Sequence, residues 1–318
     1  MGLILTAMPD IRPLTLADKN LVTGFMHRFP TEISEYTFTN LFIWQPSRPI
    51  WITEMDDSLL FLVQAAVQNE MKYLLFGPPL GDISLQQIVS ELDGKLAGAI
   101  RIPENKATAM QKAGFKVFED PDNADYVYNA ADLAELAGRR YAKKRNKIKQ
   151  CLNSYECEYA PLTPELIAEC ESMQHDWCRD RDCGRNPGLC NEANAIAEVF
   201  AHFKEFGLLG GAIRISGEIQ AFAIAEELHP GIAVWHFEKA MGGIPGLGQL
   251  INQWFAKYGL SGFKYVNREQ DLGIPGLRQA KRSYFPDHMV AKYSVGISTS
   301  QPFTIPGIKA KGCASEEY

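Results

Sequence analysis

An internal repeat is the feature that most constrains this chain. The tripeptide Pro-Leu-Thr occurs at residues 13–15 and again at 161–163. A His-x-aromatic tripeptide follows at the same spacing, at 27–29 and 175–177. Each threonine can cap the start of a helix, and an acidic side chain follows in the first turn, where it faces the positive helix end. Two motifs in phase, both at predicted helix starts, indicate that the chain contains one fold twice.

The length agrees with two domains. The chain has 318 residues, 46% of them apolar, and single hydrophobic cores stop growing at about 250–300 residues. We therefore predict an N-terminal domain at residues 1–135 and a C-terminal domain at 136–295. A Ser/Gly/Pro-rich mobile tail is expected at 296–318.

Strand and helix patterns occur in both halves and predict the α/β (α+β) class. In the first half, strands are expected at 59–67, 71–76, 99–102, 115–118 and 125–128, with helices at 85–96 and 104–113. In the second half, strands are expected at 156–159, 211–215, 219–227, 233–239, 263–266 and 289–294. Helices are expected there at 139–153, from 164 onward, and at 192–206, 249–257 and 277–283, with a polar loop at 179–189. Each domain should thus hold a mixed, largely antiparallel sheet flanked by helices.

Composition excludes some classes of function. The net charge of -6 argues against a general affinity for nucleic acid or anionic membranes, so any contact with a polyanion must be local. No apolar run is long enough to span a bilayer, and the first residues lack the basic flank and cleavage site of a signal peptide. We expect a cytoplasmic protein with no membrane span.

Six of the seven cysteines fall between residues 151 and 190. None forms a Cys-x-x-Cys pair, and their spacing matches no zinc-binding pattern. We interpret them as structural thiols and expect no metal; a metal site or a set of disulfides is the alternative.

A glycine-rich turn at residues 242–248 leaves one predicted strand and opens a helix. Free N–H groups at a helix start can bind an anion, and glycines let a phosphate approach the backbone. Gly243, Gly246 and Gly248 are therefore candidate binding residues for a phosphate-bearing donor. The alternative is a flexible connection that binds nothing.

A basic segment covers residues 139–149. It carries seven cations: Arg139, Arg140, Lys143, Lys144, Arg145, Lys147 and Lys149. Helical spacing puts Arg145 on or near the buried stripe. The segment is either a solvated helix face or a local landing site for the phosphates of a ligand or a transfer RNA.

Polar side chains gather after the strand at 263–266. Asn267, Arg268 and Glu269 follow it directly, and Arg278, Lys281 and Tyr284 come shortly afterwards. We expect Asn267, Arg268, Arg278 and Lys281 to bind the donor, together with Arg145.

Three residues are candidates for proton transfer. Glu238 precedes the glycine turn, and Glu238 or Glu269 is the candidate base, with Tyr284 as the candidate acid. Strand alternation puts His236 on the face of Glu238, and we interpret this lone histidine as a structural side chain.

These motifs resemble known families. The order of elements over residues 139–295 resembles the GNAT acyltransferase fold. Residues 276–286 and 292–293 look like the ending of the C-terminal domain of phosphatidylglycerol lysyltransferases. Residues 36–44, 144–146 and 267–269 are similar to a largely uncharacterised bacterial family grouped with those enzymes. The resemblance spans nearly the whole chain and implies two tandem GNAT-like domains.

Two departures from these families bear on the substrates. Acetyl-CoA enzymes usually begin the pyrophosphate loop with Gln or Arg, whereas this chain has Gly243, and Pro245 removes an N–H donor. This disfavours coenzyme A relative to aminoacyl-tRNA. The membrane-spanning half of the lysyltransferases has no counterpart in this sequence, which disfavours a lipid acceptor.

The resulting hypothesis is an acyl- or aminoacyltransferase without a tightly bound cofactor. Its co-substrate would be acyl-CoA or an aminoacyl-tRNA, the latter held through residues 139–149, and its acceptor a small molecule or peptide. The N-terminal domain should lack a donor site, because two of the three residues at 77–79 are prolines without N–H groups. One alternative is a non-catalytic GNAT-like binding or regulatory protein, and another is a chain whose duplicated halves build a partner interface.

Overall fold

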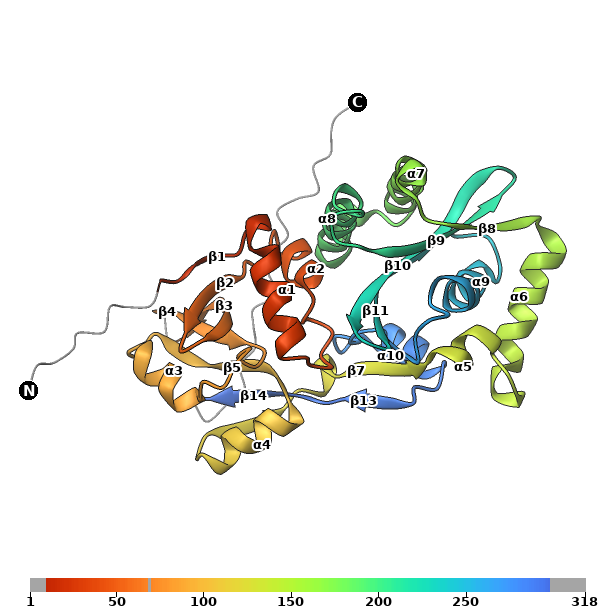
Figure 1. The fold of residues 1–318 in the computed structure, drawn as a ribbon. Helices are drawn as coiled ribbons and strands as arrows, with labels where there is room; N and C mark the ends of the chain where they lie inside the picture. Colours follow the sequence, from red (N-terminus) through yellow and green to blue (C-terminus); the bar gives the residue numbers. More distant parts are fainter. Residues whose placement is uncertain (1–9, 68–69, 298–318) are drawn as a thin grey trace, which may run out of the picture. The chain divides into compact units, whose positions relative to one another are not determined.

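The computed structural model describes residues 10–67 and 70–297, which form two compact units (Figure 1). The first unit contains the chain up to Ala124 together with the segment from Val290, and the second is Asp125–Met289. The boundary between the two units thus lies at 124/125, before the expected boundary at 135/136. The last described residues, from Val290, belong to the first unit again. Residues 298–318 of the expected tail lie outside the described residues.

The first unit is built on a mixed seven-stranded sheet of order β1-β2-β3-β4-β5-β14-β6. Its strands are β1 (Arg12–Pro13), β2 (Trp51–Met55), β3 (Ser58–Val67), β4 (Glu70–Phe76), β5 (Leu96–Pro103), β6 (Lys116–Glu119) and β14 (Lys292–Gly296). Only β4 and β5 pair in parallel. Its helices are α1 (Lys19–Arg28), α2 (Phe38–Ile43), α3 (Leu85–Glu91) and α4 (Glu104–Lys112). The apolar run in β3 explains its central place, since a strand covered on both faces has few polar positions.

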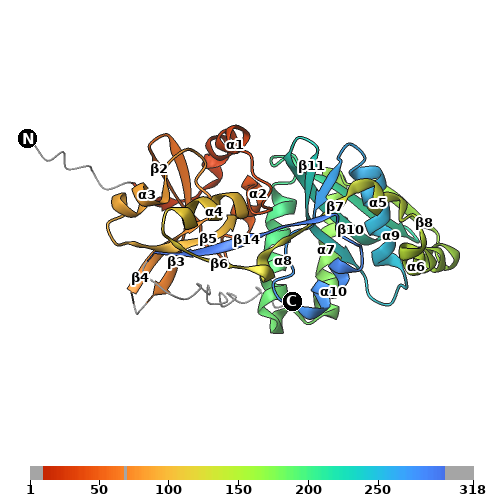
Figure 2. The same ribbon diagram turned by 90° about the horizontal axis from the view of Figure 1, so that it is seen from below.

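The last predicted strand of the sequence is two strands in the structure. Strand β13 (His288–Val290) joins the second sheet beside β7, whereas β14 lies between β5 and β6, antiparallel to both (Figure 2). The prediction of one strand over 289–294 is therefore wrong at Ala291, where the chain passes from one sheet to the other.

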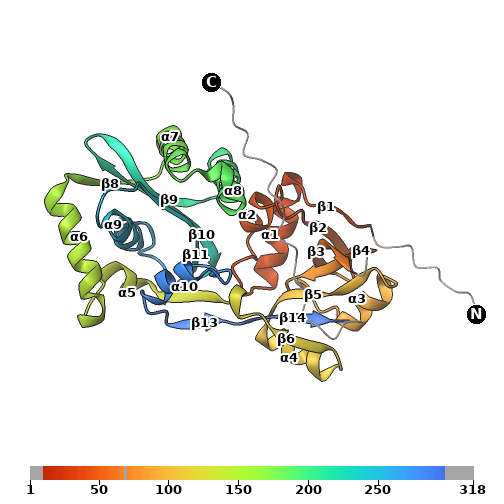
Figure 3. The same cartoon turned by 180° about the vertical axis from the view of Figure 1, so that it is seen from behind.

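The second unit also has a mixed sheet of seven strands, in the order β13-β7-β12-β11-β10-β9-β8. Its other strands are β7 (Asp125–Asn129), β8 (Cys157–Pro161), β9 (Leu209–Ile215), β10 (Glu218–His229), β11 (Ile232–Ala240) and β12 (Tyr265–Asn267). Its helices are α5 (Ala130–Glu135), α6 (Ala142–Ser154), α7 (Pro164–Asp180), α8 (Pro187–Ala201), α9 (Leu247–Trp254) and α10 (Pro275–Arg282). Helix α9 covers one face of this sheet and α7 and α8 cover the other (Figure 3).

Local sequence explains where α8 begins. The loop predicted at 179–189 is shorter, because α7 continues to Asp180 and α8 starts at Pro187. The side chain of Asn186 accepts hydrogen bonds from the N–H groups of Gly188 and Leu189, and proline suits the first helical position.

The predicted class is confirmed at the level of two mixed sheets flanked by helices. Whether each unit is a GNAT domain stays a prediction. In residues 10–67 and 70–297, no helix combines the length and the apolar character that a bilayer crossing requires.

Candidate functional site

The candidate site of the second unit lies where two parallel strands separate. Strands β11 and β12 pair only at Ile232–Val234 and Tyr265–Asn267. Beyond that point β11 continues to Ala240, while the chain leaves β12 as a loop at Arg268. Ligands of α/β sheets favour such an opening at the carboxyl ends of strands.

An ion pair occupies this opening. The guanidinium of Arg268 donates to Oε2 of Glu238 over 2.9 Å. It also lies 4.6 Å from the ring centroid of Trp235 and 5.4 Å from that of Tyr284. The charge of Arg268 is thus held between one carboxylate and two aromatic faces.

Glu238 has a second partner on helix α9. Nδ2 of Asn252 donates to the same Oε2 atom of Glu238 over 2.9 Å. Asn252 is fully buried, and its Oδ1 atom meets no hydrogen-bond donor in the part of the chain that the structure describes. A buried side chain with an unsatisfied oxygen marks a site that water or a ligand can complete.

A β-bulge in β11 separates His236 from Glu238. Trp235 and Phe237 pair with consecutive residues of β10, which leaves His236 as the extra residue. Glu238 bonds Asn252 on α9, whereas His236 bonds a side chain of β10. The prediction that both share one face is wrong, because the bulge interrupts the alternation on which it depends.

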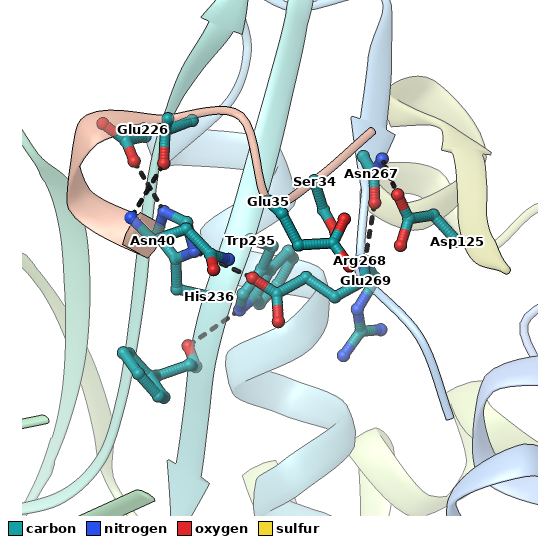
Figure 4. A network of polar contacts seen from close by, with 12 residues as sticks. Ser34, Glu35, Asn40, Asp125, Glu226, Trp235, His236, Asn267, Arg268 and Glu269 are labelled. Carbon is teal, nitrogen blue, oxygen red and sulfur yellow. Dashed lines mark hydrogen bonds and ion pairs between the residues drawn. The ribbon is translucent and has the colours of Figure 1, made fainter. Parts of the chain in front are cut away.

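His236 lies between two glutamates (Figure 4). Its Nε2 is 2.8 Å from Oε1 of Glu226, and its Nδ1 is 2.9 Å from Oε1 of Glu269. Burial alone would lower the pKa of His236, but the hydrogen bonds to Glu226 and Glu269 outweigh it and raise the pKa to about 9. Both nitrogens are engaged, which fits the interpretation as a structural side chain.

Two lysines border the opening. Lys144 of α6 lies 3.3 Å from the ring centroid of Tyr284 and donates to Oγ of Ser283 over 2.8 Å. Nζ of Lys281 donates to the backbone carbonyls of Arg268 and Glu269. Burial, reinforced by the charge of Arg268, lowers the pKa of each lysine to about 8. Burial likewise raises the pKa of Tyr284, so its hydroxyl stays protonated.

Two anchors fix the loop after β12. Arg278 donates to both oxygens of Asp271, over 2.7 and 2.8 Å, and the hydroxyl of Tyr126 donates to Oδ2 over 2.6 Å. Hydrogen bonding to Arg278 lowers the pKa of Asp271 to about 2. Asn267 accepts from the N–H of Glu269 and donates to Asp125. Arg278 and Asn267 therefore shape the loop, and their contact with a donor stays a prediction.

The glycine turn owes much of its composition to packing. Gly246 has φ +87°, and a Cβ there would lie 2.0 Å from the carbonyl oxygen of Lys147. Gly243 also has a left-handed φ of +80°. Gly242 and Gly248 have open space around their Cβ positions and no left-handed φ, so neither explanation applies to them. The close approach of α6 to α9 thus accounts for Gly246 without any ligand.

Arg145 also has a structural partner. Its Nη1 donates to the backbone carbonyls of Leu136 and Gly138, over 2.5 and 2.7 Å, just after α5. Lys143, Lys147 and Lys149 are exposed, and no carboxylate in residues 10–67 or 70–297 pairs with them. These lysines, more than Arg145, can receive external phosphates.

The structure connects most of the predicted site residues. One set of contacts contains Glu238, Asn267, Arg268, Glu269, Lys281 and Tyr284. Sequence reasoning missed Trp235, Asn252 and Glu226, whose types and spacing carry no signal on their own. In the described residues no three His, Cys, Asp or Glu side chains are arranged to hold a metal ion.

Comparisons with known proteins give this site its context. A family model described as phosphatidylglycerol lysyltransferase, C-terminal, matches residues 27–296. No curated protein matches the chain. A conserved protein of unknown function from Bacteroides thetaiotaomicron is 31% identical with a TM-score of 0.82, covering 91% of this chain and all of its own.

Two more distant structures share the fold. One is the C-terminal domain (DUF2156) of a candidate lysylphosphatidylglycerol synthetase from Agrobacterium fabrum, 13% identical with a TM-score of 0.63, covering 88% of this chain and 91% of that one. The other is L-PGS from Bacillus licheniformis, 13% identical with a TM-score of 0.62, covering 89% and 93%. The family model spans most of the chain, and this chain therefore belongs to the family of phosphatidylglycerol lysyltransferase C-terminal domains.

Proposed function

We propose that the chain moves an aminoacyl or acyl group from a phosphate-bearing donor to an amine or hydroxyl at the opening between β11 and β12. The donor would be an aminoacyl-tRNA or an acyl-CoA. The observation that carries this proposal is the Glu238–Arg268 pair, held between aromatic rings where the two parallel strands separate. Family membership supports the same class of reaction.

The side chains at the opening suit acyl transfer. The acceptor oxygen or nitrogen attacks the donor carbonyl carbon and gives up a proton, for which Glu238 is the base. Arg268 can stabilise the negative charge that develops on the carbonyl oxygen. Tyr284 is the candidate acid that gives a proton to the departing oxygen or sulfur. Glu269 is the alternative base, and one of its oxygens already bonds His236, as one oxygen of Glu238 bonds Asn252 and Arg268.

Donor binding would use the elements beside the opening. The start of α9 offers backbone N–H groups to a phosphate, and Lys147 and Lys149 on α6 offer exposed positive charge. A transfer RNA would gain from such a row of lysines, because neutralised phosphates release counterions.

A non-catalytic binding protein is the second candidate. One observation favours it: Glu238, Glu269 and Lys281 all have partners within the protein. Such a protein would bind the donor and leave it intact.

A transfer assay separates the two candidates. The chain is incubated with labelled lysyl-tRNA or acyl-CoA, each with phosphatidylglycerol vesicles or small amines, and thermal shifts are recorded in parallel. Labelled product supports transfer, and Glu238→Gln should lower the rate of its formation about 100-fold, while the exposed Glu227→Gln should leave that rate unchanged. Stabilisation by a donor without product indicates the binding protein. If the assay gives no product and no donor stabilises the chain, the result contradicts both candidate functions.

A further inference from the structure

Asn252 of α9 is a fully buried side chain at the opening, and only half of its amide has a partner. Its Nδ2 atom donates to Oε2 of Glu238 over 2.9 Å, whereas its Oδ1 atom accepts no hydrogen bond from the described residues. The amide cannot be turned round, because a carboxylate only accepts hydrogen bonds and Nδ2 must therefore face Glu238. A buried amide oxygen without a donor is costly, so its position beside a candidate base calls for a physical reason.

The donors around the ion pair at the opening are committed to other acceptors. Nε1 of Trp235 donates to the carbonyl oxygen of Phe237 over 2.9 Å. The hydroxyl of Tyr128 donates to the carbonyl oxygen of Lys281 over 2.8 Å. The Oδ1 atom of Asn252 therefore depends on a hydrogen that water or a bound molecule supplies.

Glu238 offers a second acceptor beside this oxygen. Asn252 and Arg268 both bond Oε2 of Glu238, and no group in the described part of the chain bonds Oε1. Because Nδ2 and Oδ1 belong to one amide, Oδ1 of Asn252 lies next to the carboxylate that Nδ2 contacts. The opening thus presents two neighbouring oxygens that can accept hydrogens from the same bound group.

Two neighbouring acceptors match the nitrogen of a primary amine. A neutral primary amine has two N–H groups and can donate to both oxygens while its lone pair faces the donor carbonyl carbon. A hydroxyl has one hydrogen, and giving it to Glu238 leaves Oδ1 of Asn252 unpaired. A site built to pair a particular hydrogen discriminates strongly against a substrate that lacks this hydrogen.

The charges at the opening favour the neutral form of an amine. Lys144 lies against the ring of Tyr284, which also flanks Arg268. Burial, reinforced by the charge of Arg268, lowers the pKa of Lys144 to about 8. A bound alkylamine would lose its proton for the same two reasons, and only the neutral form has the lone pair that attacks.

We infer that Asn252 selects a primary amine as the acceptor, so that the chain forms an amide and not an ester. This acceptor class rests on the proposed transfer reaction and narrows it. The amine nitrogen bonds the donor carbonyl carbon, one of its protons passes to Oε1 of Glu238, and the C–O or C–S bond of the donor breaks. The departing oxygen or sulfur takes a proton from Tyr284, and solvent returns the proton of Glu238 to Tyr284. The second N–H donates to Oδ1 of Asn252 throughout, most strongly when the nitrogen becomes positive in the transition state.

Matched acceptors test this selection. Labelled lysyl-tRNA or acyl-CoA is given to the full chain with benzylamine or benzyl alcohol, and the reaction without protein is subtracted. Mild alkali separates the stable amide from the labile ester. Asn252→Leu should lower the ratio of the amide rate to the ester rate about tenfold, because the second N–H no longer finds an acceptor. A weaker hold on Glu238 would slow both reactions alike and leave this ratio unchanged.

Two further measurements separate acceptor selection from transfer itself. Gln253→Leu changes the next, partly exposed residue of α9 and should leave the ratio unchanged. Ester formation by the wild type as fast as amide formation overturns the selection of amines while transfer stands, and so does an unchanged ratio in Asn252→Leu.

Binding to the wild type decides the matter if neither acceptor gives product or if Asn252→Leu does not fold. In calorimetry, neutral benzylamine should bind about tenfold more tightly than benzyl alcohol, and equal affinities overturn the selection of amines. Absence of product with both acceptors contradicts the transfer reaction, whatever the two affinities are.

Discussion

The carboxyl end of β4 in the first unit and that of β11 in the second have the same place in their sheets. Each belongs to a parallel pair and leads through a glycine-containing turn to a helix. The pairing of β4 with β5 continues to the end of the strand, where the N–H of Gly77 donates to the carbonyl of Ile100 over 2.8 Å. In contrast, β11 and β12 part after three residues. The first pair is closed and the second is open.

Tyr36 explains the closed end. Its hydroxyl lies 3.0 Å from the carbonyl oxygen of Phe76 and 2.5 Å from that of Pro78, and its ring fills the space where a Cβ of Gly77 would stand. At the corresponding place in the second unit, Arg268 and Glu238 form an ion pair that a ligand can displace. This difference favours the prediction that only the second unit holds a donor site.

The two units also differ in how they hold charge. Lys292 on β14 and Glu35 are both fully buried and lie 2.5 Å apart, with Arg101 3.0 Å from the other oxygen of Glu35. The Glu238–Arg268 pair is partly exposed. A buried pair broken on one side leaves an uncompensated charge, whereas a partly exposed pair can be rearranged.

The largest expected effect follows from removing Lys292. Lys292→Met should lower the free energy of unfolding by about 3–5 kcal/mol, because Glu35 is left buried beside fewer cations. Lys72→Met, which breaks an exposed pair with Glu70, should cost less than about 1 kcal/mol. Urea unfolding measures both. Equal costs would show that the first unit does not depend on its buried pair.

His236 makes the stability of the second unit depend on pH. Its folded pKa of about 9 exceeds the usual 6.5, so its contribution is complete below pH 6.5 and disappears as the pH rises through 9. The loss should be about 3 kcal/mol, since one pKa unit corresponds to about 1.4 kcal/mol. Lys144 and Lys281 act with the opposite sign between about pH 8 and 10.5.

The comparison of wild type with His236→Asn isolates the histidine, because both lysines are common to the two proteins. Unfolding is measured from pH 6 to 9.5. The stability advantage of the wild type should shrink across this range. An advantage that is constant with pH would mean that His236 is not held as a cation between Glu226 and Glu269.

Substitution at the open end should affect activity more than stability. Glu238→Gln should lower the transfer rate about 100-fold, the usual scale for loss of a general base, and keep the hydrogen bond from Arg268. The KM for the donor should change little if Glu238 acts on the acceptor. Full activity of the variant would assign the base role elsewhere, with Glu269→Gln as the next test.

Periodicity predicted most strands and helices to within a few residues, since each has a regular apolar face. It did not predict that the residues on either side of Ala291 form two strands in different sheets. The composition of these residues is the same as that expected for one continuous strand. The bulge at His236 was missed for a similar reason: it depends on how β10 pairs with β11. The candidate site residues were chosen by type and by position at or near strand ends, and the structure brings two of them, Glu238 and Arg268, into contact. Their aromatic and amide partners depend on tertiary contacts that no local pattern reveals.

The smallest expected effect concerns the closed end of β4. Tyr36→Phe should keep the ring beside Gly77 but leave the carbonyls of Phe76 and Pro78 without their hydroxyl partner, at a cost of about 1–2 kcal/mol. Tyr73→Phe is the matched control, since its hydroxyl has only a 3.5 Å contact with exposed Gln64. Urea unfolding should separate the two, and transfer activity should stay normal in both. If Tyr36→Phe instead impaired transfer as strongly as Glu238→Gln, the end of β4 would have to be part of the reaction, and the contrast between a closed and an open pair would fail.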